Sequence, residues 1–195
     1  MSKKIAIIQG HPDPSESHLN YSLAEAYKAG AEAAGHEVKV ITVAKLSFAL
    51  LTSEEEFDKH PPVTDIQGAQ DIIKWAEHIV IFYPLWLGTM PAILKGFWEQ
   101  VLRPGYALST GDRNQWPKKL LSGRSARIVV TMGMPAFVYR WFYRAHSLKN
   151  LERNILSFSG FAPIRSTLIG AVQNLSERQR KAWLDKVYQL GQKGQ

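Results

Sequence analysis

Short apolar segments alternate with longer amphipathic segments along this chain. Apolar runs of this length, closed by turn residues, are typical of strands buried in a sheet. The segments that predict strands are Lys3–Gln9, His36–Val43, His78–Tyr83, Arg127–Thr131 and Pro163–Ile169. The second of them alternates, and its pattern places Val38, Val40 and Thr42 on one face.

Apolar residues recur at helical spacing between these strands. The segments that predict helices are Ser17–Gly35, Asp65–Glu77, a stretch that opens at Pro91, a segment around Leu148–Phe158, and Ser176–Gln189. Gly35 suits a C-terminal cap, Asp65 suits an N-cap, and Ser176 with Gln179 predicts a capping box. Two segments predict irregular structure: Ala44–Pro62 and Arg103–Gly123, a loop whose length is typical of functional loops.

Strands that alternate with helices predict a parallel sheet with right-handed crossovers and helices on both faces. No repeat or linker interrupts the pattern, so we expect one α/β domain over residues 1–195. Five strands of this kind favour the flavodoxin-like three-layer sandwich with strand order 2-1-3-4-5. Ligands of that fold bind where strands 1, 3 and 4 end, so the chemistry should lie in the loops after Gln9, Tyr83 and Thr131.

The first of these loops runs from Gly10 to Asn20 and leads into a helix. The free amides and the dipole of a helix N-terminus favour a phosphate, and Ser15, Ser17 and Asn20 add side-chain donors. Helix capping by the two serines is an alternative of equal weight. The loop holds neither a Walker lysine nor a G-x-G-x-x-G motif, which disfavours a nucleotide triphosphatase and a dinucleotide-binding Rossmann site.

The second loop, Tyr83–Pro91, carries large apolar side chains where polar turn residues are usual. Trp86 and Leu87 suit the face of a planar ring, although a core role is the alternative for Trp86. The third loop, Thr131–Tyr139, contains Gly133 and ends on a tyrosine hydroxyl, for which a core or surface position is the alternative. A phosphorylated isoalloxazine would satisfy all three loops, so the pattern predicts a bound flavin.

Composition and charge narrow the function classes. The absence of cysteine excludes disulfides, thiolate metal sites, iron–sulfur clusters and cysteine nucleophiles, and the six histidines lack metal-ligand spacing, so we expect no metal. The net charge of +7 suits an anionic ligand, but the basic residues are scattered, so we expect no nucleic-acid partner. No signal peptide or apolar run of membrane-spanning length is visible, and we therefore expect a cytoplasmic protein without an integral membrane segment.

Several motifs resemble those of the NAD(P)H:quinone oxidoreductase family. They are Gly10-His11-Pro12-Asp13-Pro14 with Asn20, Pro84-Leu85-Trp86 with Pro91-Ala92-Ile93-Leu94-Lys95-Gly96, Gly105-Tyr106-Ala107, and Ser159-Gly160-Phe161. The resemblance spans nearly the whole chain, and it implies a flavin-bound homodimer with the active site at the subunit interface. It also implies FAD, or alternatively FMN, as the cofactor, and ping-pong transfer of hydride from NAD(P)H to a quinone-like acceptor.

The same resemblance assigns roles to individual positions. It places His11, Ser17, Leu19, Asn20 and Ser22 at the flavin phosphate and ribityl chain. It places Pro84, Leu85, Trp86 and Leu87, together with Thr131, Met132, Gly133 and Met134, around the ring system. Tyr139 matches a tyrosine that helps to stabilise charge on the reduced flavin. The family has a relay histidine six residues later, where this chain has Ala145, so His146 is the candidate for that role.

Two other functions follow from the same fold. Some members of the family are auxiliary proteins of potassium-efflux systems, and a flavin-binding regulatory subunit of this kind is compatible with the positive charge. A one-electron flavodoxin carrier is disfavoured, because such carriers use a Ser/Thr-rich phosphate loop with a Gly-Asn step. This chain has His11-Pro12-Asp13-Pro14 instead.

Overall fold

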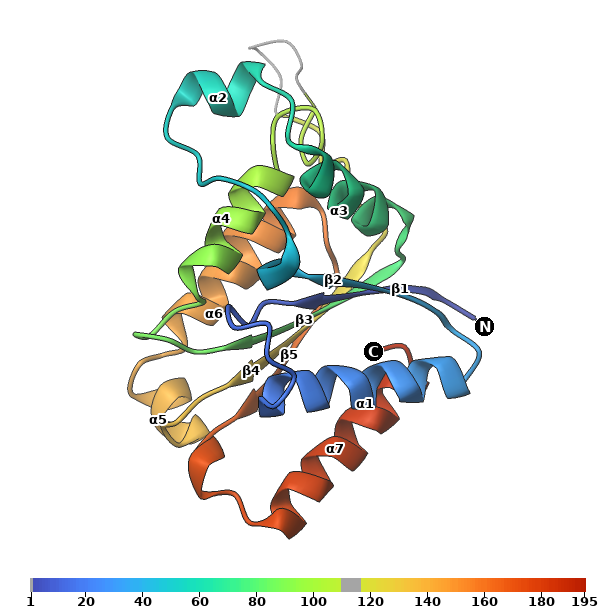
Figure 1. The fold of residues 1–195 in the computed structure, drawn as a ribbon, viewed down its shortest axis with the longest axis vertical. Helices are drawn as coiled ribbons and strands as arrows, with labels where there is room; N and C mark the ends of the chain where they lie inside the picture. The colour runs from blue at the N-terminus through green and yellow to red at the C-terminus, as the bar shows by residue number, and fades with distance from the viewer. Residues whose placement is uncertain (1, 110–116) are drawn as a thin grey trace.

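The fold is a five-stranded sheet with helices on both faces (Figure 1). The structure, a computed structural model, describes residues 2–109 and 117–195. Its strands are β1 (Lys4–Gln9), β2 (Glu37–Thr42), β3 (His78–Pro84), β4 (Ser125–Thr131) and β5 (Ile164–Ile169). All pairs are parallel and the order is β2-β1-β3-β4-β5, so the predicted topology and all five predicted strands are confirmed.

The long helices also lie where the hydrophobic period predicted them. The α-helices are α1 (Leu19–Ala33), α2 (Glu54–Lys59), α3 (Thr64–Trp75), α4 (Ala92–Val101), α5 (Ala136–Trp141), α6 (His146–Asn150) and α7 (Glu177–Gln192). A π-helical segment, Leu151–Ser157, continues α6, and 3-10 turns occupy Val43–Lys45 and Val172–Asn174. The capping box of Ser176 and Gln179 is present at the start of α7. Gly35 follows α1 with a φ of 79°, as a C-terminal glycine requires.

Two short helices lie where the sequence predicted irregular structure. α2 interrupts the segment Ala44–Pro62; it begins after Ser53, whose hydroxyl accepts a hydrogen bond from the Glu56 N–H. α5 begins after Pro135, so Tyr139 lies on a helix and not on a loop. A helix of six residues has too few apolar positions to show a helical period, which is why the pattern missed both.

One smaller expectation, an N-cap at Asp65, was wrong. The N-cap of α3 is Val63, and the carboxylate of Asp65 instead accepts a hydrogen bond of 2.7 Å from the Ser47 N–H. On β2, Val40 is 40% exposed, whereas Ile41 on the opposite face is buried. β2 is an edge strand, and helices cover its two faces unequally.

In the predicted loop Arg103–Gly123, residues 110–116 lie outside the described residues.

α1 and α7 cover one face of the sheet, where they cross in close contact (Figure 1). Glycine permits this approach. A Cβ atom on Gly30 would lie 2.1 Å from the carbonyl oxygen of Tyr188, and one on Gly191 would lie 2.1 Å from that of Tyr27. The crossing therefore depends on the absence of two side chains.

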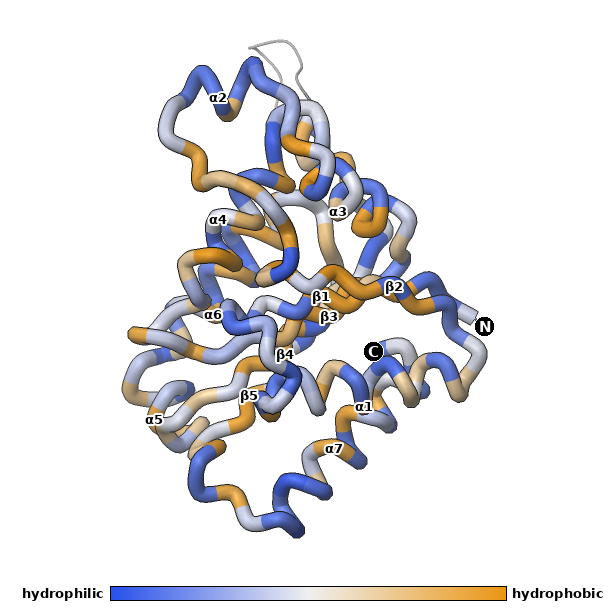
Figure 2. The backbone as a smooth tube through the Cα atoms, viewed as in Figure 1, coloured by the Kyte–Doolittle hydropathy of each residue, from blue (hydrophilic) through white to orange (hydrophobic). Residues whose placement is uncertain are grey.

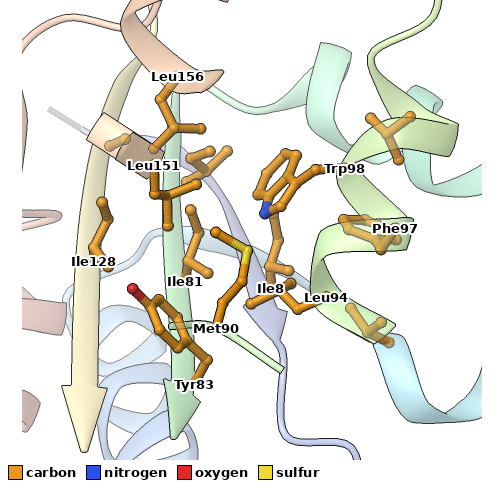
Figure 3. Close-up of a cluster of buried hydrophobic side chains, with 14 of the residues drawn as sticks. Ile8, Ile81, Tyr83, Met90, Leu94, Phe97, Trp98, Ile128, Leu151 and Leu156 are labelled. Carbon is orange, nitrogen blue, oxygen red and sulfur yellow. The ribbon is translucent and has the colours of Figure 1, made fainter. Parts of the chain in front are cut away.

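α3, α4 and the π-helical segment cover the other face (Figure 1). Figure 2 shows the hydrophobic positions concentrated on the strands and on the inner sides of the helices. Trp98 of α4 lies at the centre of the larger core with Phe97 and Leu94, facing Ile81 and Tyr83 of β3 (Figure 3). Burial on both faces holds β1, β3 and β4 rigidly, so the loops at their carboxyl ends have a firm base. None of the described helices is both long enough and apolar enough to cross a membrane.

Candidate functional site

The carboxyl ends of β1, β3 and β4 lie side by side, as the predicted topology requires. The Gly10 N–H donates a hydrogen bond of 2.7 Å to the Phe82 carbonyl, so the first loop leaves β1 directly beside β3. The Leu85 N–H donates one of 2.7 Å to the Thr131 carbonyl, which joins the second loop to the third. The three loops therefore border one edge of the sheet.

Side chains connect the same three strand ends. The Asn20 side-chain amide donates a hydrogen bond of 3.0 Å to the Thr131 hydroxyl, which ties the start of α1 to the end of β4. Gln9 donates to the Asn20 carbonyl at 3.2 Å, and its side-chain oxygen accepts from the His11 N–H at 3.2 Å. Sequence reasoning missed Gln9, although a polar residue that ends an apolar strand at the ligand edge was a usable signal.

The first loop is held by a compact set of polar contacts. The rings of His11 and His18 stack with centroids 4.0 Å apart, and His18 Nε2 lies 2.7 Å from the Asp13 carboxylate. The Tyr21 hydroxyl donates to the Asp13 carbonyl at 3.1 Å, a contact that the sequence did not suggest. These contacts fix the loop conformation at the N-terminus of α1.

Charge in this loop is distributed unequally. Burial lowers the pKa of His11 below its ordinary value, and the neighbouring His18 adds to the effect, so the His11 ring is neutral at pH 7. The hydrogen bond from His18 lowers the pKa of the exposed Asp13 carboxyl, and the Ser15 N–H acts in the same direction. Any anion held here must therefore depend on amide groups and the helix dipole more than on His11.

The start of α1 offers such groups. The N-cap residue His18 makes no side-chain capping bond, and the first turn contains no acidic residue. Within the described residues, the N–H groups of Leu19 and Asn20 donate to no protein acceptor. Unpaired amides at a helix N-terminus suit a phosphate. Ser17 is exposed beside them, with its hydroxyl 2.9 Å from that of Ser15.

The structure separates Ser22 from the other residues assigned to the flavin. Its side chain lines a hollow of about 270 Å³ together with Thr42 and Lys45, on the β2 side of α1. Asn20 points instead toward β4. Two residues two positions apart on a helix lie nearly on opposite sides of it, which explains the divergence.

The second loop is a tight hairpin that extends past the sheet edge. Trp86 and Thr89 exchange backbone hydrogen bonds of 2.9 and 3.0 Å around Leu87 and Gly88, which have φ angles of 46° and 81°. The Leu87 side chain is fully exposed, Trp86 is 49% exposed, and Pro84 and Leu85 are half-buried. A rigid turn that displays apolar side chains to solvent is unusual, and it provides a surface for a planar ligand.

The third loop approaches this edge through Thr131, Met132, Gly133 and Met134. Thr131 and Met132 are buried, while Gly133 is exposed. The side chain of Gln173 covers one side of Gly133, where a Cβ atom would lie 3.0 Å from its oxygen. Gln173 is a second residue that sequence reasoning missed, because it follows β5 and lies far away in the chain.

The two residues assigned to catalysis lie further along the same segment. Tyr139 is 2% exposed; its hydroxyl lies 2.6 Å from the Ser147 hydroxyl and accepts a hydrogen bond of 3.1 Å from the Leu148 N–H. The hydroxyl therefore stabilises the start of α6. His146 is exposed at the first position of α6, after Ala145, whose φ is 49°. Their catalytic roles stay predictions.

These features fit a flavin in its general requirements. The unpaired amides of α1 suit a phosphate, and the exposed apolar hairpin suits the ring system. The backbone of the buried strand ends provides fixed polar groups between them. Among the described residues, no three His, Asp or Glu side chains gather as a metal ion would require.

Comparison with proteins of known sequence gives several relatives. A Haemophilus influenzae protein named as an uncharacterised NAD(P)H oxidoreductase is 31% identical over 129 residues, which cover 66% of this chain and 63% of that protein. Human ribosyldihydronicotinamide dehydrogenase [quinone] is 28% identical over 148 residues, which cover 69% of this chain and 61% of that protein. The ancillary protein KefG of a glutathione-regulated potassium-efflux system from Cronobacter sakazakii is 26% identical over 138 residues, which cover 70% of this chain and 62% of that protein. The chain thus spans less than two thirds of the length of these curated relatives.

Solved structures share the fold. An NAD(P)H:quinone oxidoreductase from Methanothermobacter marburgensis superposes with a TM-score of 0.80 at 22% identity, covering 98% of this chain and 96% of that one. An FMN-dependent NADH-azoreductase from Bacillus anthracis, solved in complex with FMN, gives a TM-score of 0.76 at 15% identity, covering 99% of each chain. The sequence also matches the flavodoxin-like fold family over residues 3–190, nearly its whole length. With its sheet order, its strand-end loops and this match in agreement, the chain belongs to the flavodoxin-like family.

Proposed function

We propose that this protein is a flavin-dependent oxidoreductase that passes hydride from NAD(P)H to quinones or similar planar aromatic acceptors. The observation that carries the proposal is the exposed hairpin of Trp86 and Leu87 at the same sheet edge as the unpaired N-terminus of α1. The names of the Haemophilus and human relatives agree with it. The experiment is to purify the protein with added flavin and to measure NADH and NADPH oxidation with a 1,4-naphthoquinone. A protein that stays colourless and oxidises neither nucleotide would refute the proposal.

The residues of this chain would divide the binding task. The α1 amides of Leu19 and Asn20 hold the phosphate, while Trp86 and Leu87 cover the ring and exclude water from one side. The bond from Asn20 to Thr131 keeps these two ends in register. The flavin, when bound, supplies the two-electron chemistry, and the protein supplies position and electrostatics.

We propose FMN as the cofactor, with FAD as the alternative outcome. The structural neighbour solved with FMN covers the same length of chain, and the features described above provide for one phosphate and one ring system. Mass spectrometry of the ligand released on denaturation distinguishes the two flavins.

We also propose a ping-pong order, in which NAD(P)H leaves before the acceptor binds. This order predicts parallel lines in double-reciprocal plots at several acceptor concentrations. Intersecting lines would reject that order.

A homodimer with the active site at its interface is the proposed assembly. Its support is exposed apolar surface near the site and on a neighbouring face, including Leu87, Trp86 and Phe158, of which Phe158 is 52% exposed. A partner subunit would cover such surface. Analytical ultracentrifugation of the flavin-loaded protein is expected to give about twice the mass of 22.0 kDa. A monomer with full quinone reductase activity would exclude the interface site.

A second candidate rests on the similarity to KefG. In this alternative, the chain binds flavin and regulates a membrane transport system of the potassium-efflux type, for which its net charge of +7 suits an acidic partner surface. Co-purification from detergent-solubilised membranes in a fixed ratio with a transporter would favour this function. Recovery of the free protein with high quinone reductase activity would favour the enzyme.

A further inference from the structure

A groove of about 700 Å³ lies along the outer edge of β5, between α5 and α6 on one side and α7 on the other. None of its lining residues belongs to the loops Gly10–Asn20 or Tyr83–Pro91. Its volume lies within the range of small-molecule sites. Of the third strand-end loop, Thr131–Tyr139, only Ala136 and Phe137 line the groove, so it contains none of the residues assigned to the flavin phosphate or ring.

The groove is strongly cationic. Four basic side chains line it against one acidic side chain, Glu152; they are Arg140, Arg144, Lys149 and Lys186. Within the part of the chain that the structure describes, none of the four forms an ion pair. Unpaired cations on opposing walls of a groove attract an anion, and arginine in particular suits phosphate.

A further cation lies beneath the floor of the groove. Arg127 is 7% exposed and donates a hydrogen bond of 2.9 Å to the hydroxyl of Thr167, which lines the groove. No carboxylate pairs with it among the described residues. A buried guanidinium without a counter-charge is costly, and an anion in the groove would offset part of that cost.

The groove also contains aromatic side chains. Trp141 is 78% exposed, and its ring has no aromatic or cationic partner among the described residues. Trp183 is different, because Lys186 lies 4.6 Å from its ring centroid and occupies one face. Phe137, which is 67% exposed, also lines the groove, and of the two rings left free to stack on a planar ligand Trp141 has the larger face.

The edge of β5 contributes backbone donors. The carbonyls of Pro163 and Ile169 accept hydrogen bonds from the N–H groups of Ala126 and Met132. The backbone groups of Ser166 and Leu168, at alternate positions, therefore point away from β4. Only residues 166–168 of β5 line the groove. This stretch is too short to pair with an added peptide strand, which favours a small molecule over a peptide.

We propose that this groove binds a small anion that carries a planar ring, of the nucleoside phosphate class. The phosphates would meet Arg140 and Lys186 from the two walls, and the ring would stack on Trp141. The site is additional to the proposed oxidoreductase function and does not depend on it.

Calorimetric titration of the protein, loaded with FMN and then freed of excess flavin by desalting, tests the proposal with three probes: ADP, pyrophosphate and adenosine. ADP should bind at least fivefold more tightly than pyrophosphate, and adenosine should not bind at millimolar concentration. The variants Arg140→Gln and Lys186→Gln should each weaken ADP binding about tenfold, while the exposed Arg178→Gln on α7, outside the groove, should change it less than twofold. Trp141→Ala should reduce ADP affinity to that of pyrophosphate and leave pyrophosphate binding unchanged.

Several results would overturn the proposal. The groove would have no anion site if ADP did not bind at millimolar concentration. The same would follow if Arg178→Gln weakened ADP binding as much as Arg140→Gln and Lys186→Gln do. Binding of a glutamate octapeptide more tightly than ADP would point to a protein partner. The KM values for NADH and NADPH should stay unchanged in Arg140→Gln and Lys186→Gln, since a parallel rise would make the groove part of the co-substrate site. If the oxidoreductase proposal fails, the calorimetric result stands on its own.

Discussion

Asn20 and Thr131 are 111 positions apart in the chain, and their side chains are joined by a hydrogen bond of 3.0 Å. Both are buried, at 2% and 5% exposure, so the bond is shielded from water. It links the first turn of α1 to the last residue of β4, the two elements that border the candidate flavin site on either side of β3. Because the Thr131 carbonyl also accepts a hydrogen bond of 2.7 Å from the Leu85 N–H, the bond ties the start of α1 to the base of the hairpin that carries Trp86 and Leu87.

Asn20→Ala should weaken flavin binding. A hydrogen bond contributes about 1 kcal/mol net, and the variant also leaves the start of α1 less firmly placed. We expect the Kd for FMN to rise about tenfold, corresponding to ~1.4 kcal/mol. Quenching of flavin fluorescence on titration measures it. Ser22→Ala is the matched control, because its side chain faces Thr42 and Lys45, and it should change the Kd less than twofold. Equal losses in the two variants would contradict the geometry.

Leu87→Asn should stabilise the protein and impair its function. Leu87 has a φ of 46°, a left-handed conformation that costs a branched apolar residue about 1 kcal/mol and that asparagine adopts more readily. We expect the Tm to rise by about 2–4 °C in calorimetry without ligand. The KM for a naphthoquinone should rise severalfold, because an apolar contact is lost.

Leu50→Asn provides the control for Leu87→Asn. Leu50 is also exposed, at 55%, but it has no left-handed backbone and lies outside the three loops. It should raise neither the Tm nor the KM. If Leu87→Asn leaves the KM unchanged, the hairpin does not cover the ring.

Tyr139→Phe should lower stability. The change leaves the Leu148 N–H without its partner and breaks the contact with Ser147, and an unsatisfied buried donor costs about 1–3 kcal/mol. Urea unfolding measures this loss, and Ser147→Ala should show a smaller one. The catalytic role that the family resemblance implies predicts, in addition, a severalfold fall in the rate of flavin reduction in stopped flow, with little change in flavin affinity. A rate within twofold would show that the hydroxyl serves the fold alone.

Acid should destabilise the protein through His78. Burial lowers the pKa of His78 to about 3, and Lys3, Arg127 and Arg165 act in the same direction. Above pH 6.5 the ring is neutral in both folded and unfolded chains, so its contribution to stability is complete there. As the pH falls from 6.5 toward 3, only the unfolded chain binds the proton. The free energy of unfolding should then fall by up to about 1.4 kcal/mol per pH unit.

Chemical unfolding at a series of pH values checks the effect of His78. His78→Gln should make the free energy of unfolding depend less steeply on pH between pH 6 and pH 4. This expectation holds whatever the substitution does to stability at pH 7. His36→Gln, at a half-buried position, should keep the slope of the unaltered protein. An unchanged slope in His78→Gln would assign the acid sensitivity to other groups.

The order of the strands and long helices was predictable from the sequence. The segments Ile5–Ile8 and Ile79–Phe82 are apolar without interruption because the sheet is covered on both faces, and this signal is local in the chain. The helices α2 and α5 were not predictable in this way, since each has six residues, too few to show a period; α2 begins at the Ser53 cap, and α5 follows Pro135 without a side-chain cap.

The sequence by itself determined the fold class and the edge of the sheet at which the candidate site lies, because hydrophobic periodicity and strand order follow from near neighbours in the chain. Only the tertiary structure decided which side chains meet there. It joined Asn20 to Thr131, turned Ser22 toward β2, and engaged the Tyr139 hydroxyl with α6. It also formed the cationic groove beside β5 from three helices and a strand edge. Contacts between distant segments depend on packing and helix rotation, and a linear pattern does not encode these directly.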